Sequence, residues 1–208
     1  MLKIEQRESW GAVGQTGAPL RLEVDYVVIH HGANAKVENT VEAERALLRQ
    51  WEGEHMKRSP PFVGLGYNFV VFPSGRVYMG RGWGRVGAHA GRKDVNMRSL
   101  GICYAVHGDT VGLTPEARDS IRALIEVGLE EGYVSPRFKL TGHLDHKATR
   151  CPGKKVYAQL GELDPRVSLP GTREYPKLDE LEKRVEMVGV QSNVLAQLWR
   201  KLFGKNRG

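Results

Sequence analysis

Short apolar runs with the composition of β-strands alternate along this chain with segments of helical periodicity, and this alternation restricts the fold more than any other feature. The segment 25–32, DYVVIHHG, is rich in β-branched residues and closes on Gly32, which predicts a buried strand. Helical spacing follows over 39–55, with Asn39 or Thr40 as the predicted N-cap. The first predicted unit is therefore a strand that leads into a helix.

The alternation continues along the chain. Over 66–81, two apolar runs flank the turn signal PSG and predict a β-hairpin. The run 99–106, SLGICYAV, predicts another buried strand, and 114–132 predicts a helix that begins with Thr114 as its cap and Pro115 in its first turn. Strands interleaved with helices are typical of a layered domain. We therefore predict an α/β fold with a central mixed β-sheet flanked by helices.

A change of composition near residue 164 divides the 208 residues into three predicted parts. Residues 1–163 form the predicted domain, and residues 164–176, DPRVSLPGTREYP, are a predicted linker because they are rich in proline. Residues 177–208 predict a C-terminal amphipathic helix with heptad spacing. Its heptad positions hold Leu178, Leu181, Val185, Val188, Leu195 and Leu202.

Three roles are open for this predicted C-terminal helix. Its heptad seam favours self-association with a second copy. Its end, LWRKLFGKNRG, combines basic and apolar side chains and resembles a segment that contacts anionic membrane or cell wall. The third role is packing back on the domain.

The formal net charge is +7, from 31 Lys and Arg against 24 Asp and Glu. Such a charge favours polyanionic partners, among them nucleic acid, anionic lipid and cell-wall polymers. Neither zinc-finger pairing nor an aromatic and basic array accompanies the charge, so we do not expect nucleic acid as a partner.

The N-terminal segment 1–13, MLKIEQRESWGAV, is mixed and charged. It contains neither the apolar core nor the small-residue cleavage site of a signal peptide. We therefore expect the protein to be made in the cytoplasm without export by such a peptide.

The chain has two cysteines in very different settings. Cys103 lies inside an apolar run and is a predicted core residue. Cys151 lies in the polar segment 142–153, GHLDHKATRCPG, only eight positions after His143. The PG end of this segment predicts a sharp turn, so both side chains can face one centre. Imidazole and thiolate are preferred zinc ligands, which predicts a metal site here.

A third ligand is needed, because catalytic zinc sites typically take three protein ligands and one water. His30 and His31 end the first predicted strand. Successive side chains of a strand point to opposite faces, so only one of the two histidines faces the site. The spacing leaves open which one.

Five segments, VVIHH, GYNFVVFPSGRVYMGRG, VGAHA, SLGICY and GHLDHKATRCPG, occur in the order typical of one enzyme family. Over residues 6–157 the chain resembles the type 2 N-acetylmuramoyl-L-alanine amidases, a superfamily of phage lysozyme-type amidases and peptidoglycan recognition proteins. The resemblance implies zinc-dependent hydrolysis of the amide bond between N-acetylmuramic acid and L-alanine in bacterial peptidoglycan.

The resemblance also implies roles for individual residues. His30, the first histidine of the pair, matches a zinc ligand of the family, together with His143 and Cys151. Tyr67 matches the tyrosine that points a hydroxyl at the developing oxyanion. Thr149 occupies a position that is Lys in some phage members and Thr in recognition-protein amidases, which makes it a second predicted catalytic donor.

Four further residues are predicted to border the substrate. His31 is expected in the cleft wall or behind the ligands. The stretch 83–102 resembles the part of the family that borders the substrate groove, and there His89, Asn96 and Arg92 are predicted to meet the acidic peptide stem.

Within this resemblance, the absence of a signal peptide favours a phage or prophage endolysin, a bacteriolytic and antimicrobial enzyme that reaches the wall on lysis. A cytoplasmic amidase that recycles wall fragments is the competing enzymatic setting. The alternative of another class is a non-catalytic peptidoglycan-binding recognition module, which needs no zinc.

Overall fold

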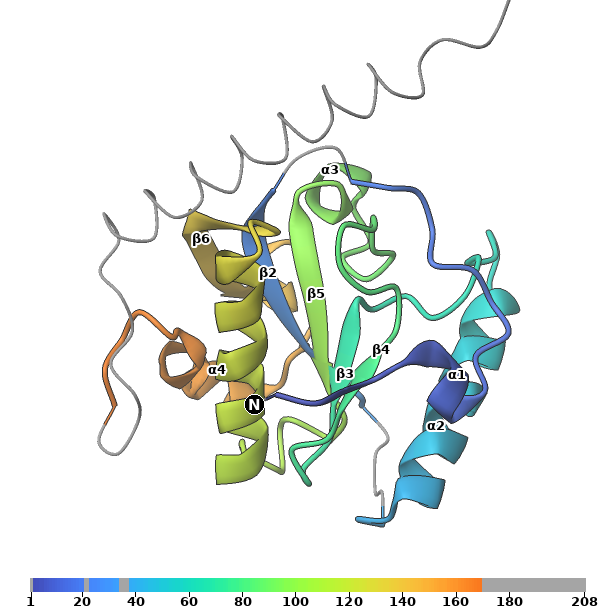
Figure 1. The fold of residues 1–208 in the computed structure, drawn as a ribbon, viewed down its shortest axis with the longest axis horizontal. Helices are drawn as coiled ribbons and strands as arrows, with labels where there is room; N and C mark the ends of the chain where they lie inside the picture. Colours follow the sequence, from blue (N-terminus) through green and yellow to red (C-terminus); the bar gives the residue numbers. More distant parts are fainter. Residues whose placement is uncertain (1, 21–22, 34–37, 170–208) are drawn as a thin grey trace, which may run out of the picture.

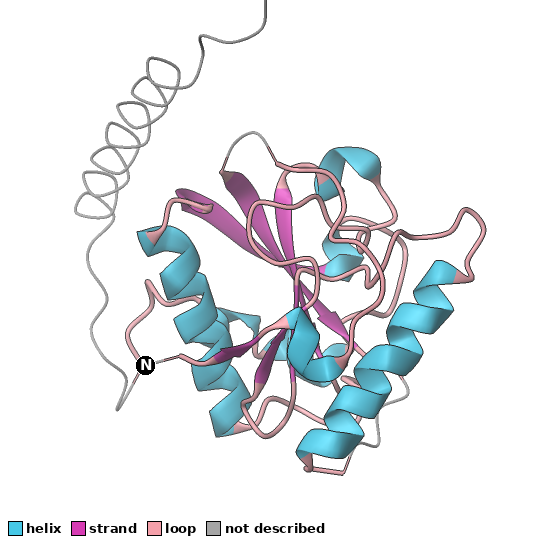
Figure 2. Cartoon of the chain, turned by 45° about the vertical axis from the view of Figure 1, so that its right-hand side comes forward, coloured by secondary structure: helices cyan, strands magenta, loops and turns pink. Residues whose placement is uncertain are grey.

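Six strands form one mixed sheet in the order β1-β4-β3-β5-β2-β6, with helices on both faces (Figures 1 and 2). The computed structural model describes residues 2–20, 23–33 and 38–169. The strands are β1 (Ile4–Glu5), β2 (Val24–His31), β3 (Phe69–Val71), β4 (Val77–Met79), β5 (Ser99–Tyr104) and β6 (Val134–Gly142). The helices are α1 (Arg7–Trp10), α2 (Val41–Met56), α3 (Lys93–Asn96), α4 (Pro115–Glu130) and α5 (Lys154–Ala158), with 3₁₀ turns η1 (His143–Asp145) and η2 (Leu160–Leu163).

Strand pairing confirms the predicted mixed sheet. β2 lies between β5 and β6 and is parallel to both, and β3 is parallel to β5. β3 and β4 form the predicted antiparallel hairpin. Because β2 and β6 run side by side in the same direction, their carboxyl ends meet at one edge of the sheet.

Alternation along β2 divides the core between the two faces of the sheet. Val27 and Ile29 are fully buried in the cluster that includes Leu124 of α4. On the other face, Cys103 of β5 is fully buried in a second cluster with Leu48 of α2, as predicted for a core cysteine. α4 and α2 therefore cover opposite faces of the sheet.

Both long helices begin at the predicted caps. The Thr40 hydroxyl accepts the backbone N–H of Ala43 at the start of α2, and the Thr114 hydroxyl accepts that of Ala117 at the start of α4, each at 3.2 Å. Among the described residues, neither these helices nor the shorter ones are long and apolar enough to cross a membrane.

The predicted C-terminal part is largely not described. The predicted linker 164–176 is described to residue 169, and the predicted amphipathic helix over 177–208 lies outside the described residues. Its predicted self-association and its predicted contact with membrane or wall stay predictions.

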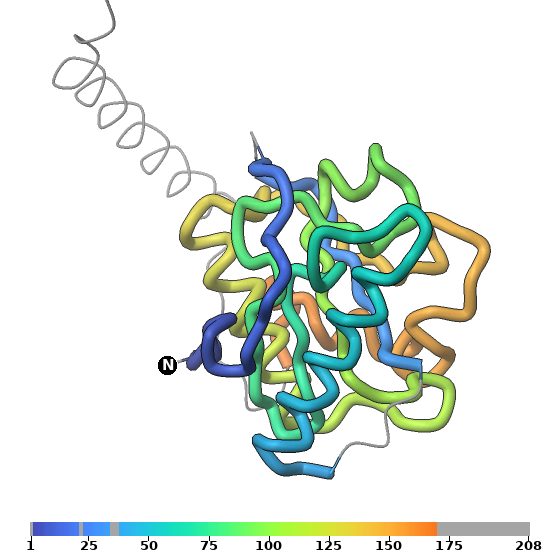
Figure 3. The backbone as a smooth tube through the Cα atoms, turned by 90° about the vertical axis from the view of Figure 1, so that its right-hand side faces the viewer, coloured from blue at the N-terminus to red at the C-terminus, as the bar shows by residue number. Residues whose placement is uncertain are grey.

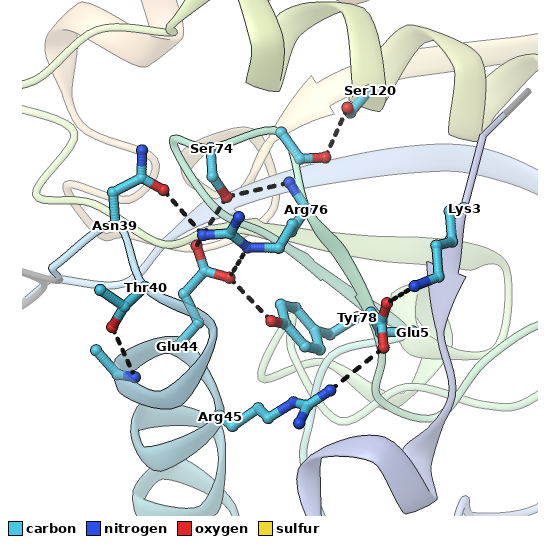
Figure 4. A network of polar contacts seen from close by, with 12 residues as sticks. Lys3, Glu5, Asn39, Thr40, Glu44, Arg45, Ser74, Arg76, Tyr78 and Ser120 are labelled. Atoms are coloured by element: carbon cyan, nitrogen blue, oxygen red, sulfur yellow. Dashed lines mark hydrogen bonds and ion pairs between the residues drawn. The ribbon is translucent and has the colours of Figure 1, made fainter.

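A buried carboxylate joins α2 to the β3–β4 hairpin (Figure 4). Glu44, which is 1% exposed, accepts hydrogen bonds from Arg76 Nε at 2.6 Å, from the Tyr78 hydroxyl at 2.9 Å and from the Ser74 hydroxyl at 2.7 Å. Burial and the hydrogen bond to Glu44 raise the pKa of Tyr78 well above its ordinary value. Each oxygen of the carboxylate is satisfied by donors from the hairpin.

We expect Glu44→Ala to lower the free energy of unfolding by about 3 kcal/mol, measured by urea denaturation. Breaking a buried pair costs roughly 3–5 kcal/mol because its partners stay behind unpaired, and the lower end applies here because the Arg76 side chain is 33% exposed. Asp94→Ala is the matched control, since it breaks the exposed pair with Arg92 and should lower the free energy of unfolding far less than Glu44→Ala does. Equal losses in the two variants would contradict this role of Glu44.

Candidate metal centre

A cleft of about 360 Å³ opens where β2 ends. In Figure 3 the blue strand β2 runs between the teal segment around residues 57–67 and the orange segment around residues 142–153. These segments, together with α2 and the loop before α3, supply the lining residues of the cleft. The lining includes His30, His31, Trp51, His55, Arg58, Tyr67, His89, His143, Lys147, Thr149 and Cys151.

The three predicted zinc ligands come together in this cleft. One ligand atom each of His30, His143 and Cys151 lies within 4.8 Å of the other two. His30 is near the end of β2, and His143 begins the turn directly after β6, so the parallel pairing of β2 and β6 brings the two imidazoles to one edge of the sheet. Of the His30–His31 pair, only His30 belongs to this trio.

The Cys151 thiol is held in place by its loop. The backbone N–H of His31 donates to Cys151 Sγ at 3.4 Å, and the Leu144 N–H donates to the Cys151 carbonyl at 2.8 Å. Gly153 has a φ of 85°, and a Cβ there would lie 2.2 Å from the Gly108 carbonyl carbon. The glycine of the CPG sequence therefore lets the loop close against the neighbouring segment and brings the thiol beside His30.

The geometry and the donor types fit a zinc ion. Bonds of about 2.3 Å to sulfur and about 2.0–2.1 Å to nitrogen, at tetrahedral angles, separate two ligand atoms by about 3.5 Å. Cys151 Sγ lies 3.6 Å from His30 Nδ1. His143 Nε2 lies 3.1 Å from the Ala90 carbonyl, which leaves its Nδ1 as the available nitrogen. Imidazole nitrogen and cysteine sulfur are both established zinc ligands, and three protein ligands leave the fourth position open, as in a catalytic site.

The protonation states of these residues suit metal binding. Burial lowers the pKa of His30 well below its ordinary value, and it also lowers the pKa of His143. Both rings are therefore neutral at pH 7, as a ligand must be. Burial raises the pKa of Cys151 to about 11, although the His31 N–H opposes this rise. Metal binding at neutral pH therefore displaces a proton from the thiol.

The two predicted catalytic residues, Tyr67 and Thr149, both line the cleft beside the trio. The Tyr67 ring centroid lies 5.3 Å from that of His30. Burial, with a contribution from the neighbouring thiols, raises the pKa of Tyr67 well above its ordinary value, so its hydroxyl stays protonated and can donate. Thr149 Oγ1 accepts the Cys151 N–H at 3.2 Å, which leaves its own proton free to donate.

His31 also lines the cleft. Its Nδ1 accepts the backbone N–H of Gly108 at 3.0 Å, so the proton of the neutral ring is on Nε2. Burial lowers the pKa of His31, and the nearby His107 lowers it further. The ring is therefore a neutral donor at pH 7.

The other three predicted substrate-binding residues have different surroundings. His89 is 7% exposed and lines the cleft, but both of its ring nitrogens have partners inside the protein. Asn96 is not among the residues that line the cleft, and its side-chain oxygen accepts the backbone N–H groups of His89 and Ala90. Arg92 does not line the cleft either and pairs with Asp94 on the surface.

Asp145, the loop carboxylate nearest the ligands in sequence, shapes the loop. Its Oδ2 accepts the Gly142 N–H at 2.8 Å, and its Oδ1 accepts the Tyr157 hydroxyl at 2.7 Å. It does not line the cleft. Asp145 therefore connects Gly142, at the start of the loop, to Tyr157 of α5, which follows the loop.

The wall of the cleft opposite the trio was not predicted from the sequence. Trp51 and His55 are four residues apart on α2, a spacing that places them on one face of the helix, and Arg58 follows the helix. His55 Nδ1 accepts the Gly66 N–H at 3.0 Å, and burial lowers its pKa to about 4. The helical spacing was visible, but only the packing of α2 shows which face borders the cleft.

Comparisons with known proteins show what this chain is similar to. Residues 20–154 match the family model described as N-acetylmuramoyl-L-alanine amidase. A peptidoglycan-recognition protein of Drosophila simulans is 36% identical over 161 residues, which cover 76% of this chain and 85% of that protein. Peptidoglycan recognition protein 1 of Bos taurus is 34% identical over 158 residues, which cover 74% of this chain and 80% of that protein.

Solved structures show the same fold. Drosophila PGRP-LB superposes with a TM-score of 0.71 at 28% identity, over 76% of this chain and 92% of that one. Peptidoglycan recognition protein-LE, solved in complex with tracheal cytotoxin, a monomeric diaminopimelic acid-type peptidoglycan, superposes with a TM-score of 0.70 at 33% identity, over 76% and 91% of the two chains.

Proposed function

This chain belongs to the N-acetylmuramoyl-L-alanine amidase family, and from that premise we propose that it is a zinc-dependent amidase that cleaves the bond between N-acetylmuramic acid and L-alanine in bacterial peptidoglycan. The observation that carries the proposal is the convergence of His30, His143 and Cys151 in one cleft. A thiol held beside two neutral imidazoles serves metal chemistry, whereas peptidoglycan binding alone has no need of it.

A zinc ion held by this trio would supply a Lewis acid that lowers the pKa of a water molecule to about 7 and polarises the amide carbonyl. The residues of the chain then have separate tasks. Tyr67 donates its hydroxyl proton to the negative charge that develops on the carbonyl oxygen, and Thr149 is placed to donate a second hydrogen bond. His31 offers its Nε2 proton to the substrate from the cleft wall.

A recognition module without catalysis is the second candidate. The relatives reported above carry the name of peptidoglycan recognition proteins, and the structure of one of them holds a peptidoglycan fragment. Such a module would bind the peptide stem in the same cleft. The ligand trio and the adjacent Tyr67 favour the amidase instead.

The endolysin setting is a separate proposal. It is supported by the net charge of +7, which suits anionic cell wall, and by the proposed reaction. The reported relatives are recognition proteins, so they do not bear on it. Added protein that lowers the turbidity of a suspension of outer-membrane-permeabilised bacteria would support a lytic role, and intact cells after complete hydrolysis of isolated wall fragments would contradict it.

Mass spectrometry of the products tests the proposed reaction. We expect purified peptidoglycan to release peptides that begin with L-alanine, because the proposed cleavage frees the amino group of that residue. A chelator should stop this release, and added zinc should restore it, since the ligand trio is the proposed source of the catalysis. Tight binding to the wall without released peptides would identify a recognition module.

A further inference from the structure

His89 joins a ligand of the proposed zinc ion to a buried serine. His89 Nδ1 lies 2.9 Å from His30 Nε2, and His89 Nε2 lies 3.3 Å from Ser99 Oγ. None of the three side chains is exposed by more than 7%. A Cβ at Gly101 would lie 2.3 Å from the His89 ring, so the ring packs directly on the backbone of β5.

The hydrogen bonds link His30, His89 and Ser99 in a series that ends at the Val95 carbonyl. This last acceptor fixes the direction of each bond. Ser99 Oγ lies 2.7 Å from the Val95 carbonyl oxygen, which can only accept, so Ser99 donates its one proton there. Ser99 must then accept from His89 Nε2. A buried imidazole between two neutral groups is itself neutral, because an unpaired buried charge is very costly. His89 Nδ1 therefore has the lone pair and accepts the Nε2 proton of His30.

Ala90, the residue after His89, fixes the position of the proton on the second proposed ligand, His143. The Ala90 carbonyl lies 3.1 Å from His143 Nε2 and can only accept, so the proton of the neutral His143 ring is on Nε2. Both imidazoles thus have their Nδ1 lone pairs available for metal binding. Asn96 Oδ1 holds the segment 89–90 by accepting both of its backbone N–H groups, at 3.2 and 2.9 Å.

We propose that the segment 89–90, held by Asn96, fixes the Nε2-protonated form of both histidine ligands and thereby prepares their Nδ1 atoms for the metal. This inference deepens the proposed function and rests on it, because it presupposes a metal at the trio. His89 and Asn96 are positioning residues in this arrangement. Two of the four residues predicted from the sequence to bind substrate, His89 and Asn96, thus act on the proposed ligands instead.

Nuclear magnetic resonance of the metal-free, ¹⁵N-histidine-labelled protein tests the arrangement without substrate. We expect slowly exchanging Nε2 protons for His30 and His143 in the wild type. His89→Asn retains an oxygen acceptor where Nδ1 was and should keep the His30 signal. His89→Leu offers no acceptor and should lose that signal, while the His143 signal, which depends on the Ala90 carbonyl, stays.

Zinc affinity, measured by competition with a chromogenic chelator, is the second readout. Loss of a group that orients a metal ligand typically costs 10–100-fold in metal affinity, so we expect a loss of about that size for His89→Leu and a much smaller one for His89→Asn. Ser99→Ala removes the oxygen that accepts the His89 Nε2 proton and should give an intermediate loss of zinc affinity. This variant tests the inference even if His89→Leu does not fold.

The inference would be overturned if folded His89→Leu or Ser99→Ala bound zinc as tightly as the wild type and showed the same His30 signal as the wild type. These readouts use no substrate. A wild type that binds zinc and shows both signals but releases no peptides beginning with L-alanine would contradict the proposed function alone.

Discussion

Cys151→Ser should leave the purified protein without bound zinc and almost without the proposed amidase activity. The substitution replaces the soft donor of the trio by a hydroxyl that stays protonated at neutral pH, and the remaining two imidazoles bind zinc far more weakly. A metal ion contributes several kcal/mol of transition-state stabilisation, so we expect turnover to fall by about 10³-fold or more. Elemental analysis of the protein and mass spectrometry of released peptides measure the two effects.

The second cysteine provides the control. Cys103 is fully buried on β5 and is not a member of the trio, so Cys103→Ala should retain its zinc. If Cys151→Ser kept both zinc and hydrolysis, the assignment of the metal site would be wrong. Loss of zinc with full retention of hydrolysis would show that the reaction does not use the metal.

Tyr67→Phe should keep its zinc and lose turnover by about 10²-fold or more, which is the usual effect of removing one hydrogen-bond donor to an oxyanion. The hydroxyl is the only group removed, and the ring still packs against His30. We expect the loss in kcat with little change in KM, because the interaction forms in the transition state. Steady-state kinetics on a soluble muramyl peptide would measure both constants.

A second tyrosine, which contacts the loop 142–153 through Asp145, provides a matched comparison. Tyr157 donates its hydroxyl to Asp145 and does not line the cleft, so Tyr157→Phe should have a far smaller effect on kcat. Because burial raises the pKa of Tyr67 well above its ordinary value, its contribution should persist as the pH rises from 7 to 9. An unchanged kcat in Tyr67→Phe would remove this residue from the mechanism.

Four of the six strands were predictable from the sequence, because β2, β3, β4 and β5 are short apolar runs next to clear turn signals. β1 has only two residues, and β6 contains Pro136 and several polar residues, so neither was predicted. The hairpin around PSG and the helices that begin at Thr40 and Thr114 follow from local chemistry alone. The proposed metal ligands were predicted from their residue types and from the resemblance to a family. Strand alternation showed that only one of His30 and His31 can face the site, but it did not show which one.

The roles of His89 and Asn96 were not predictable in this way. Both are polar residues in a loop, and such residues usually face solvent or a ligand. Here the loop packs so closely on β5 that the His89 ring reaches Ser99, and the Asn96 side chain turns back to the backbone. These contacts join residues whose neighbours in sequence give no sign of the pairing, so only the packed structure reveals them.

The two walls of the cleft are built and anchored separately. The ligand wall comes from β2, from the turn after β6 and from the loop that ends in Cys151. The opposite wall comes from α2 and the segment after it, and Glu44 fastens the start of that helix to the hairpin. The two walls nevertheless touch at Trp51, whose ring lies 6.4 Å from that of Tyr67 and which a Cβ at Gly32 would approach to 2.3 Å. A change at Trp51 would therefore reach both Tyr67 and the end of β2. Arg58 lies over the Phe62 ring within its own wall, so in the proposed amidase it is the position where substrate preference could change at less cost to the chemistry.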